Sequence, residues 1–74
     1  MDFKCYEGKF VTKELLINNL KENPEVESIE ELDYSIIINL KDKKSYDMLY
    51  VPINNKIKIE GTYEIHKSLN LGSY

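Results

Sequence analysis

Apolar and polar residues alternate along the second half of the chain, which is the pattern of half-buried β-strands. We predict strands over residues 34–40, 46–53 and 56–65. A short loop around residues 42–44 joins the first two strands. Asn54-Asn55 forms a tight turn between the last two, because asparagine tolerates a positive φ. Such short connections make consecutive strands antiparallel neighbours, so the pattern predicts an antiparallel meander.

The lengths of the two connections determine which residues face each other across the meander. A three-residue loop places Ile38 opposite Met48, and a two-residue turn places Tyr50 opposite Ile59. Gly61 then also falls opposite Met48, where a missing side chain admits the helix or a β-bulge. One face of the sheet collects the apolar residues and is the predicted core face: Tyr34, Ile36, Ile38, Leu40, Tyr46, Met48, Tyr50, Pro52, Ile57, Ile59, Gly61, Tyr63 and Ile65.

Ile37 points to the opposite face, because neighbouring residues of a strand alternate in direction. The predicted register sets Ile37 beside Leu49, with Val51 and Ile53 nearby. These four side chains form an apolar cluster inside a charged rim. A cluster of this kind on the second face of a sheet has to be covered by something.

Two explanations of this cluster stay open at the level of sequence. In the first, the chain covers it with residues 24–33 or with the C-terminal tail through Leu69 and Leu71. In the second, a partner protein or a second copy of the chain covers it, since contiguous apolar patches on small domains often mark association sites.

The first half of the chain predicts one helix that begins after Thr12. Thr12 is a good N-cap residue, and Val11 before it stands where a hydrophobic staple meets Leu16. The helix ends at Asn23-Pro24, because the residue before proline is pushed out of the α region. Its apolar stripe consists of Leu15, Leu16 and Leu20.

Two other segments of the first half are weaker. Phe3 and Cys5 alternate with a lysine and indicate a short strand that Gly8 ends, with Cys5 as a small half-buried residue. Residues 24–33 fit either a short second helix or an edge strand. We favour the helix, because Val26 and Ile29 are spaced for one helix face and glutamate is a poor strand residue.

Length and composition fit one α+β domain over residues 1–74: an N-terminal strand and helix packed on a three- to four-stranded antiparallel meander. The chain has 74 residues, of which 42% are hydrophobic and 31% charged. No apolar run of the sequence comes near the length of a membrane span, so we expect no membrane span and a cytoplasmic protein. Alanine is absent while Ile, Lys and Asn are abundant. This composition suggests an AT-rich genome, as in some bacteria and their phages.

The sequence contains no recognisable set of catalytic residues, and we expect no enzymatic activity. The only cysteine, Cys5, and the only histidine, His66, lack the neighbours of a nucleophilic site, and the three glycines are too scattered for a phosphate loop. We therefore expect no cofactor and no metal site. All ten basic residues are lysine. Direct nucleic-acid binding is disfavoured, because arginine is the preferred side chain for such contacts.

The strongest feature in the composition is an acidic segment between the helix and the meander. Its acidic residues are Glu22, Glu25, Glu27, Glu30, Glu31 and Asp33. Most such runs form a solvated face that keeps a protein soluble. The sharper interpretation is that this segment docks on a basic surface, of the kind that normally holds nucleic acid, on a partner protein.

These observations favour a small protein-binding domain without catalytic activity. In this hypothesis it is a phage or mobile-element inhibitor or adaptor that occupies a partner's surface inside a bacterial or phage-infected cell. The alternative hypothesis is a structural homo-oligomer, such as a homodimer, that buries the second sheet face against its own copy. The predicted partner-binding residues are Glu25, Glu27, Glu30, Glu31, Asp33, Ile37, Leu49 and Val51.

Overall fold

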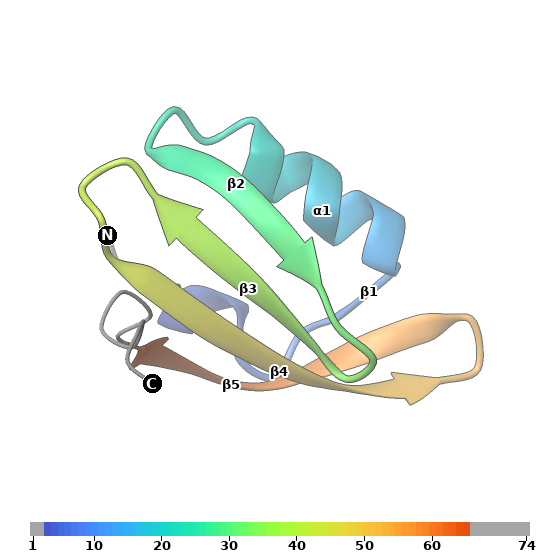
Figure 1. Cartoon of the computed structure of the whole chain (residues 1–74). Helices are drawn as coiled ribbons and strands as arrows, with labels where there is room; N and C mark the ends of the chain where they lie inside the picture. Colours follow the sequence, from blue (N-terminus) through green and yellow to red (C-terminus); the bar gives the residue numbers. More distant parts are fainter. Residues whose placement is uncertain (1–2, 66–74) are drawn as a thin grey trace.

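A computed structural model describes residues 3–65 and shows an α+β fold with one curled antiparallel sheet (Figure 1). The elements are η1 (Lys4–Tyr6, a 3-10 turn), β1 (Phe10–Val11), α1 (Lys13–Lys21), β2 (Val26–Glu31), β3 (Ser35–Leu40), β4 (Ser45–Ile53) and β5 (Lys56–Ile65). The strand order is β1-β5-β4-β3-β2. The predicted fold class and meander are confirmed in outline, but the sheet has five strands instead of three or four.

Helix α1 forms where the sequence predicts it. The Thr12 hydroxyl accepts a hydrogen bond from the Leu15 amide at 3.1 Å, so the predicted N-cap is confirmed. Leu16 and Leu20 are buried, whereas Leu15 is 52% exposed and Ile17 packs against the core instead. Within residues 3–65, no helix combines the length and the apolar character needed to cross a membrane.

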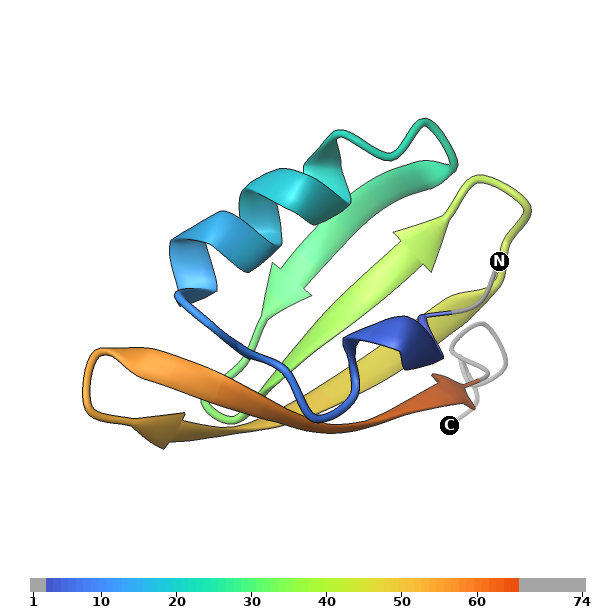
Figure 2. The ribbon, with the colours of Figure 1, turned by 180° about the vertical axis from the view of Figure 1, so that it is seen from behind.

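The core lies between the sheet and the segments that cover one of its faces, α1 and η1 (Figure 2). The predicted central residues Ile36, Ile38, Met48 and Ile59 are completely buried. Phe3 joins them from the N-terminal segment. The predicted core face is therefore correct at its centre. At its ends the prediction is wrong, because Tyr34, Pro52 and Tyr63 are exposed.

The N-terminal strand is a wrong prediction. Residues Lys4–Tyr6 form the 3-10 turn η1, which buries Phe3 and exposes Cys5. Gly8 ends this segment with a φ of 84°, which is readily available to glycine. Its amide donates to the Ile59 carbonyl at 2.7 Å. The chain thus joins the edge of the sheet later than predicted, through β1.

Residues 24–33 are not a helix: β2 runs along the edge of the sheet beside β3. The register shifts between Val26 and Ser28, so Glu27 is an extra residue. This bulge lets Val26 and Ile29 both pack against the core although they are three residues apart. The spacing that looked helical is therefore produced by an irregular strand.

The two hairpin registers differ from the prediction in separate ways. The β3–β4 loop consists of residues 41–44, and Ile38 faces Tyr46 instead of Met48. This shift of two residues leaves every side chain on its predicted face. The β4–β5 pairing is correct near the turn, where Asn54 has a φ of 56°. It then shifts between Leu49 and Tyr50.

Candidate functional site: the open face of the sheet

The sheet face opposite α1 and η1 is covered by no helix or strand among residues 3–65 (Figure 1). We call it the open face. Side chains that lie directly opposite each other on neighbouring strands form rows across it, and the paired residues define these rows. The open face consists of Phe10, Ser28, Glu30, Leu32, Ser35, Ile37, Asn39, Ser45, Asp47, Leu49, Val51, Ile53, Lys56, Lys58, Gly61, Tyr63 and Ile65.

One end of the open face is polar and held by hydrogen bonds. The Asn39 amide donates to the Ser28 hydroxyl at 3.1 Å and to the Glu30 carboxylate at 3.0 Å. The Ser45 hydroxyl donates to the Asn39 side-chain oxygen at 2.7 Å. These bonds connect three strands, and their donors and acceptors are already engaged. The polar side chains at this end therefore satisfy one another within the chain and do not require a binding partner.

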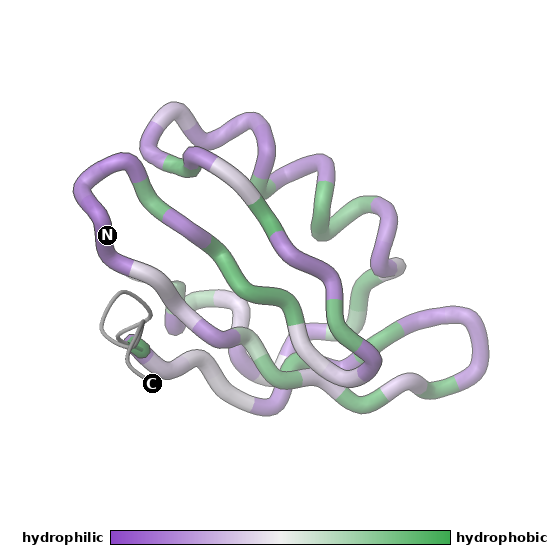
Figure 3. The backbone as a smooth tube through the Cα atoms, in the orientation of Figure 1, coloured by the Kyte–Doolittle hydropathy of each residue, from purple (hydrophilic) through white to green (hydrophobic). Residues whose placement is uncertain are grey.

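The remainder of the open face carries most of the exposed apolar side chains of residues 3–65. Eight large hydrophobic side chains of residues 3–65 are exposed, and six of them lie here: Phe10, Leu32, Leu49, Val51, Ile53 and Tyr63. Apolar stretches are visible along β3 and along the hairpin of β4 and β5 (Figure 3). Of the eight, Leu15 and Tyr34 alone lie elsewhere.

Ile37 lies at the centre of the open face but is only 8% exposed. It stands directly between Glu30 and Asp47 on the neighbouring strands, whereas the predicted neighbour Leu49 faces Ser35. The predicted pairing of Ile37 with Leu49 is therefore wrong. Leu49 and Val51 remain accessible, with exposures of 38% and 44%, so they and not Ile37 present the surface.

Asp47 is the only acidic residue of β4, and its side chain lies on the open face. Within residues 3–65, its Oδ1 is the only buried side-chain nitrogen or oxygen without a hydrogen-bond partner. Its row neighbours are Ile37 and Tyr63. An unpartnered carboxylate oxygen beside an aliphatic and an aromatic side chain is energetically unfavourable.

Tyr63 reaches the open face because of the irregularity in β5. The pairing skips Glu60, so Thr62 turns to the covered side and Tyr63 to the open side. A Cβ atom on Gly61 would lie 2.6 Å from the Tyr63 hydroxyl, which shows that the tyrosine ring lies across the glycine. Gly61 therefore admits an aromatic ring beside a bulge, while the helix lies on the other face.

The acidic residues proposed for partner binding do not form one patch. Glu30 accepts a hydrogen bond on the open face, and Glu31 points to the covered side. Glu27 occupies the bulge of β2, while Glu25 and Asp33 lie beyond its two ends. The acidic segment thus lines the edge of the sheet and borders the open face at Glu30.

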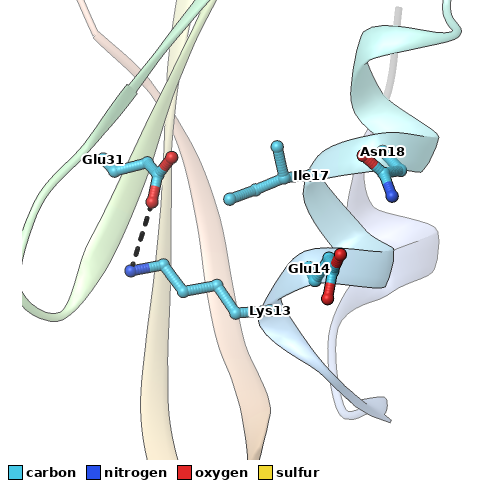
Figure 4. A pocket seen from close by; sticks show the side chains of 5 residues that line it. All are labelled: Lys13, Glu14, Ile17, Asn18 and Glu31. Atoms are coloured by element: carbon cyan, nitrogen blue, oxygen red, sulfur yellow. Dashed lines mark ion pairs between the residues drawn. The ribbon is translucent and has the colours of Figure 1, made fainter.

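A groove of about 410 Å³ lies between α1 and β2, on the covered side of the sheet, and is lined by Lys13, Glu14, Ile17, Asn18 and Glu31 (Figure 4). Lys13 Nζ lies 3.5 Å from Glu31 Oε1 and 5.5 Å from the centre of the Tyr50 ring. Hydrogen bonding to Tyr50 raises the pKa of Lys13; partial burial opposes this rise, and the charge interactions with Tyr50 and then with Glu31 add to it. These contacts tie the helix to the sheet.

Sequence reasoning missed Phe10, Leu32 and Tyr63 as members of the open face. Phe10 pairs with Lys58 through a strand of two residues, which is too short to show alternation. The Leu32 amide donates to the Ser35 carbonyl and so continues the ladder beyond β2. The predicted cover by residues 24–33 is wrong. The predicted cover by Leu69 and Leu71, like His66, falls outside the described residues.

Neither a metal centre nor a relative helps to assign the chain. Among residues 3–65, no three His, Cys, Asp or Glu side chains are grouped so that they would hold a metal ion. Comparisons with protein-family models, curated proteins and solved structures gave no match. The assignment of function therefore rests on the open face itself.

Proposed function

We propose that this chain is a protein-binding domain without catalytic activity, and that the open face is its docking surface. The observation that carries this proposal is the gathering of Phe10, Leu32, Leu49, Val51, Ile53 and Tyr63 on the face of the sheet that no helix or strand of residues 3–65 covers. Single exposed apolar residues are common on proteins, but a contiguous patch usually marks an interface.

The composition of the patch supports recognition of a protein. Phe10 and Tyr63 supply aromatic area that loses little conformational entropy on binding. Polar residues border the patch, with Glu30 at one end and Lys56 and Lys58 at the other. An apolar centre with a charged border is the usual anatomy of a protein interface.

The acidic edge of β2 gives this domain a second property. Glu25, Glu27 and Asp33 are exposed along or beyond this edge strand. Charges of this kind speed association with a basic partner and orient it, while adding little to affinity. They also oppose edge-to-edge aggregation of β2. A domain that binds in this way acts as an adaptor or an inhibitor by occupying a surface.

Site-specific photo-crosslinking tests the proposal. A photoreactive phenylalanine derivative replaces Val51 on the open face, and a matched variant carries it at Leu15, which is similarly exposed on α1. We expect light to produce a protein adduct from position 51 and none from position 15. Equal adducts from both positions, or none from position 51, would contradict the docking role of the open face.

A further inference from the structure

We infer that the occupant of the open face is a second copy of this chain, related by a two-fold axis that crosses the strands near Leu49. This inference rests on the proposed function, in that it names the polypeptide that docks on the same face. The inference is carried by the positions of the charged side chains on the open face, which the strand pairings define. They are Glu30, Asp47, Lys56 and Lys58.

The acidic and basic residues of the open face occupy opposite sides of Leu49. Asp47 and Glu30 share one row, which precedes the row of Leu49 by two residues along β4. Lys58 pairs with Val51 and lies in the row that follows Leu49 by two residues. Each row is thus about 7 Å from that of Leu49. Lys56 lies one row farther out, opposite Ile53.

A two-fold axis across the strands exchanges these two sides. Stacked sheets pack about 10 Å apart with strands within about 30° of each other. Under this symmetry Leu49 meets its own copy near the axis, and Asp47 comes beside Val51 of the second copy. Lys58 of the second copy is then one strand away from Asp47. Both copies gain this pairing, as a two-fold interface requires.

The same arrangement compensates the least satisfied group of the face. Asp47 Oδ1 is buried without a hydrogen-bond partner within residues 3–65. A lysine of the second copy close to this carboxylate would offset its cost of desolvation. Tyr63, in the row of Asp47, is also brought near Lys58 of the second copy. An ammonium group near an aromatic ring is favourable.

The other face-to-face symmetry is disfavoured by charge. An axis along the strands would place the row of Asp47 over itself and the row of Lys58 over itself, which brings like charges together. Size is no obstacle to a dimer. The molecule measures 40 × 27 × 17 Å, so its broad face is large compared with the roughly 500 Å² per copy at which specific interfaces begin.

Mixing two charge variants tests this inference directly. Asp47→Lys alone sets lysine against Lys58, and Lys58→Asp alone sets aspartate against Asp47, so each variant should raise the dissociation constant of the dimer about tenfold or more. An equimolar mixture restores two opposite-charge pairs and should form a heterodimer with an affinity near that of the wild type. Sedimentation equilibrium measures the mass, starting from a monomer of 8.7 kDa.

Matched charge changes away from the open face serve as controls. Glu22→Lys and Lys44→Glu alter the net charge as much as the test variants but concern exposed residues at the end of α1 and in the β3–β4 loop. They should leave the dissociation constant unchanged. Circular dichroism verifies the fold of every variant. If Asp47→Lys does not fold, Leu49→Glu replaces it as a variant expected to be monomeric.

Several results would overturn the second copy as occupant. The first is a wild-type mass of one chain at all concentrations up to about 1 mM. The second is a dissociation constant of the dimer that does not change in the single variants. The third is a mixture of the two variants that associates no more tightly than either variant alone. If the wild type is monomeric while position 51 crosslinks to a different protein, the homodimer is excluded and the proposed function stands. If position 51 also gives no adduct, both proposals fail.

Discussion

Ile37 and Ile38 are adjacent on β3 and face opposite sides of the sheet, so replacing each by alanine compares the two faces with identical chemistry. Ile38 is completely buried in the core, and Ile38→Ala should lower the free energy of unfolding by about 3–5 kcal/mol, since a cavity remains. Ile37 is 8% exposed and does not belong to the core cluster on the covered face. Ile37→Ala should cost about 1–2 kcal/mol, because no enclosed cavity forms.

Urea unfolding measures this difference. The assay uses Lys58→Asp as the background, so that self-association does not add to the stability. A domain of 74 residues has about 4–11 kcal/mol to lose. With a slope near 1 kcal/mol per molar urea, the midpoints of the two variants should differ by about 1 M or more. Equal midpoints, or a larger loss for Ile37→Ala, would refute the assignment of the two faces.

Three further predictions concern the covered side and the bulge. The Thr62 amide donates to Glu7 at 2.9 Å and lowers the pKa of Glu7 below its usual 4.5, so this stabilisation is present above pH 4.5 and disappears as the pH falls through the lowered value. Glu7→Gln should therefore melt lower than the wild type at pH 6, and this deficit should shrink as the pH falls below 4.5; a deficit that does not change with pH would contradict this account. Thr12→Ala should cost about 1 kcal/mol by urea unfolding through loss of the N-cap, with Thr12→Ser near wild type; an equal loss in both variants would exclude the cap as the cause. Gly61→Ala should lower the melting temperature in the wild type but not in a Tyr63→Ala background, because the three atoms nearest to the new Cβ all belong to the tyrosine side chain; a loss in both backgrounds would show a backbone cause.

The centre of the fold was predictable because strand alternation is robust to error. The β3–β4 register is shifted by two residues, and a shift by an even number keeps Ile36, Ile38 and Met48 on the core face. The helix was predictable from local chemistry, since Thr12 and Pro24 act on the backbone within a few residues. Neither conclusion depends on contacts that are distant in sequence.

The bulges and the edges were not predictable. Glu27 and Glu60 are extra residues that depend on pairing with β3 and β4, and each changes which later side chains face the core. The first makes an acidic strand look helical, and the second moves Tyr63 to the open face. The candidate site was therefore found in outline through Leu49 and Val51, while its aromatic members were missed.

The most direct test of the open face as a docking surface is the concentration dependence of its NMR signals. Methyl signals of Leu49 and Val51 are followed from about 10 µM to about 1 mM, with those of Leu15 and Ile17 on α1 as internal controls. We predict that the signals of Leu49 and Val51 move with concentration while the signals from α1 stay fixed. Movement confined to Leu15 and Ile17, or no movement of Leu49 and Val51 up to the highest concentration, would contradict self-association through the open face.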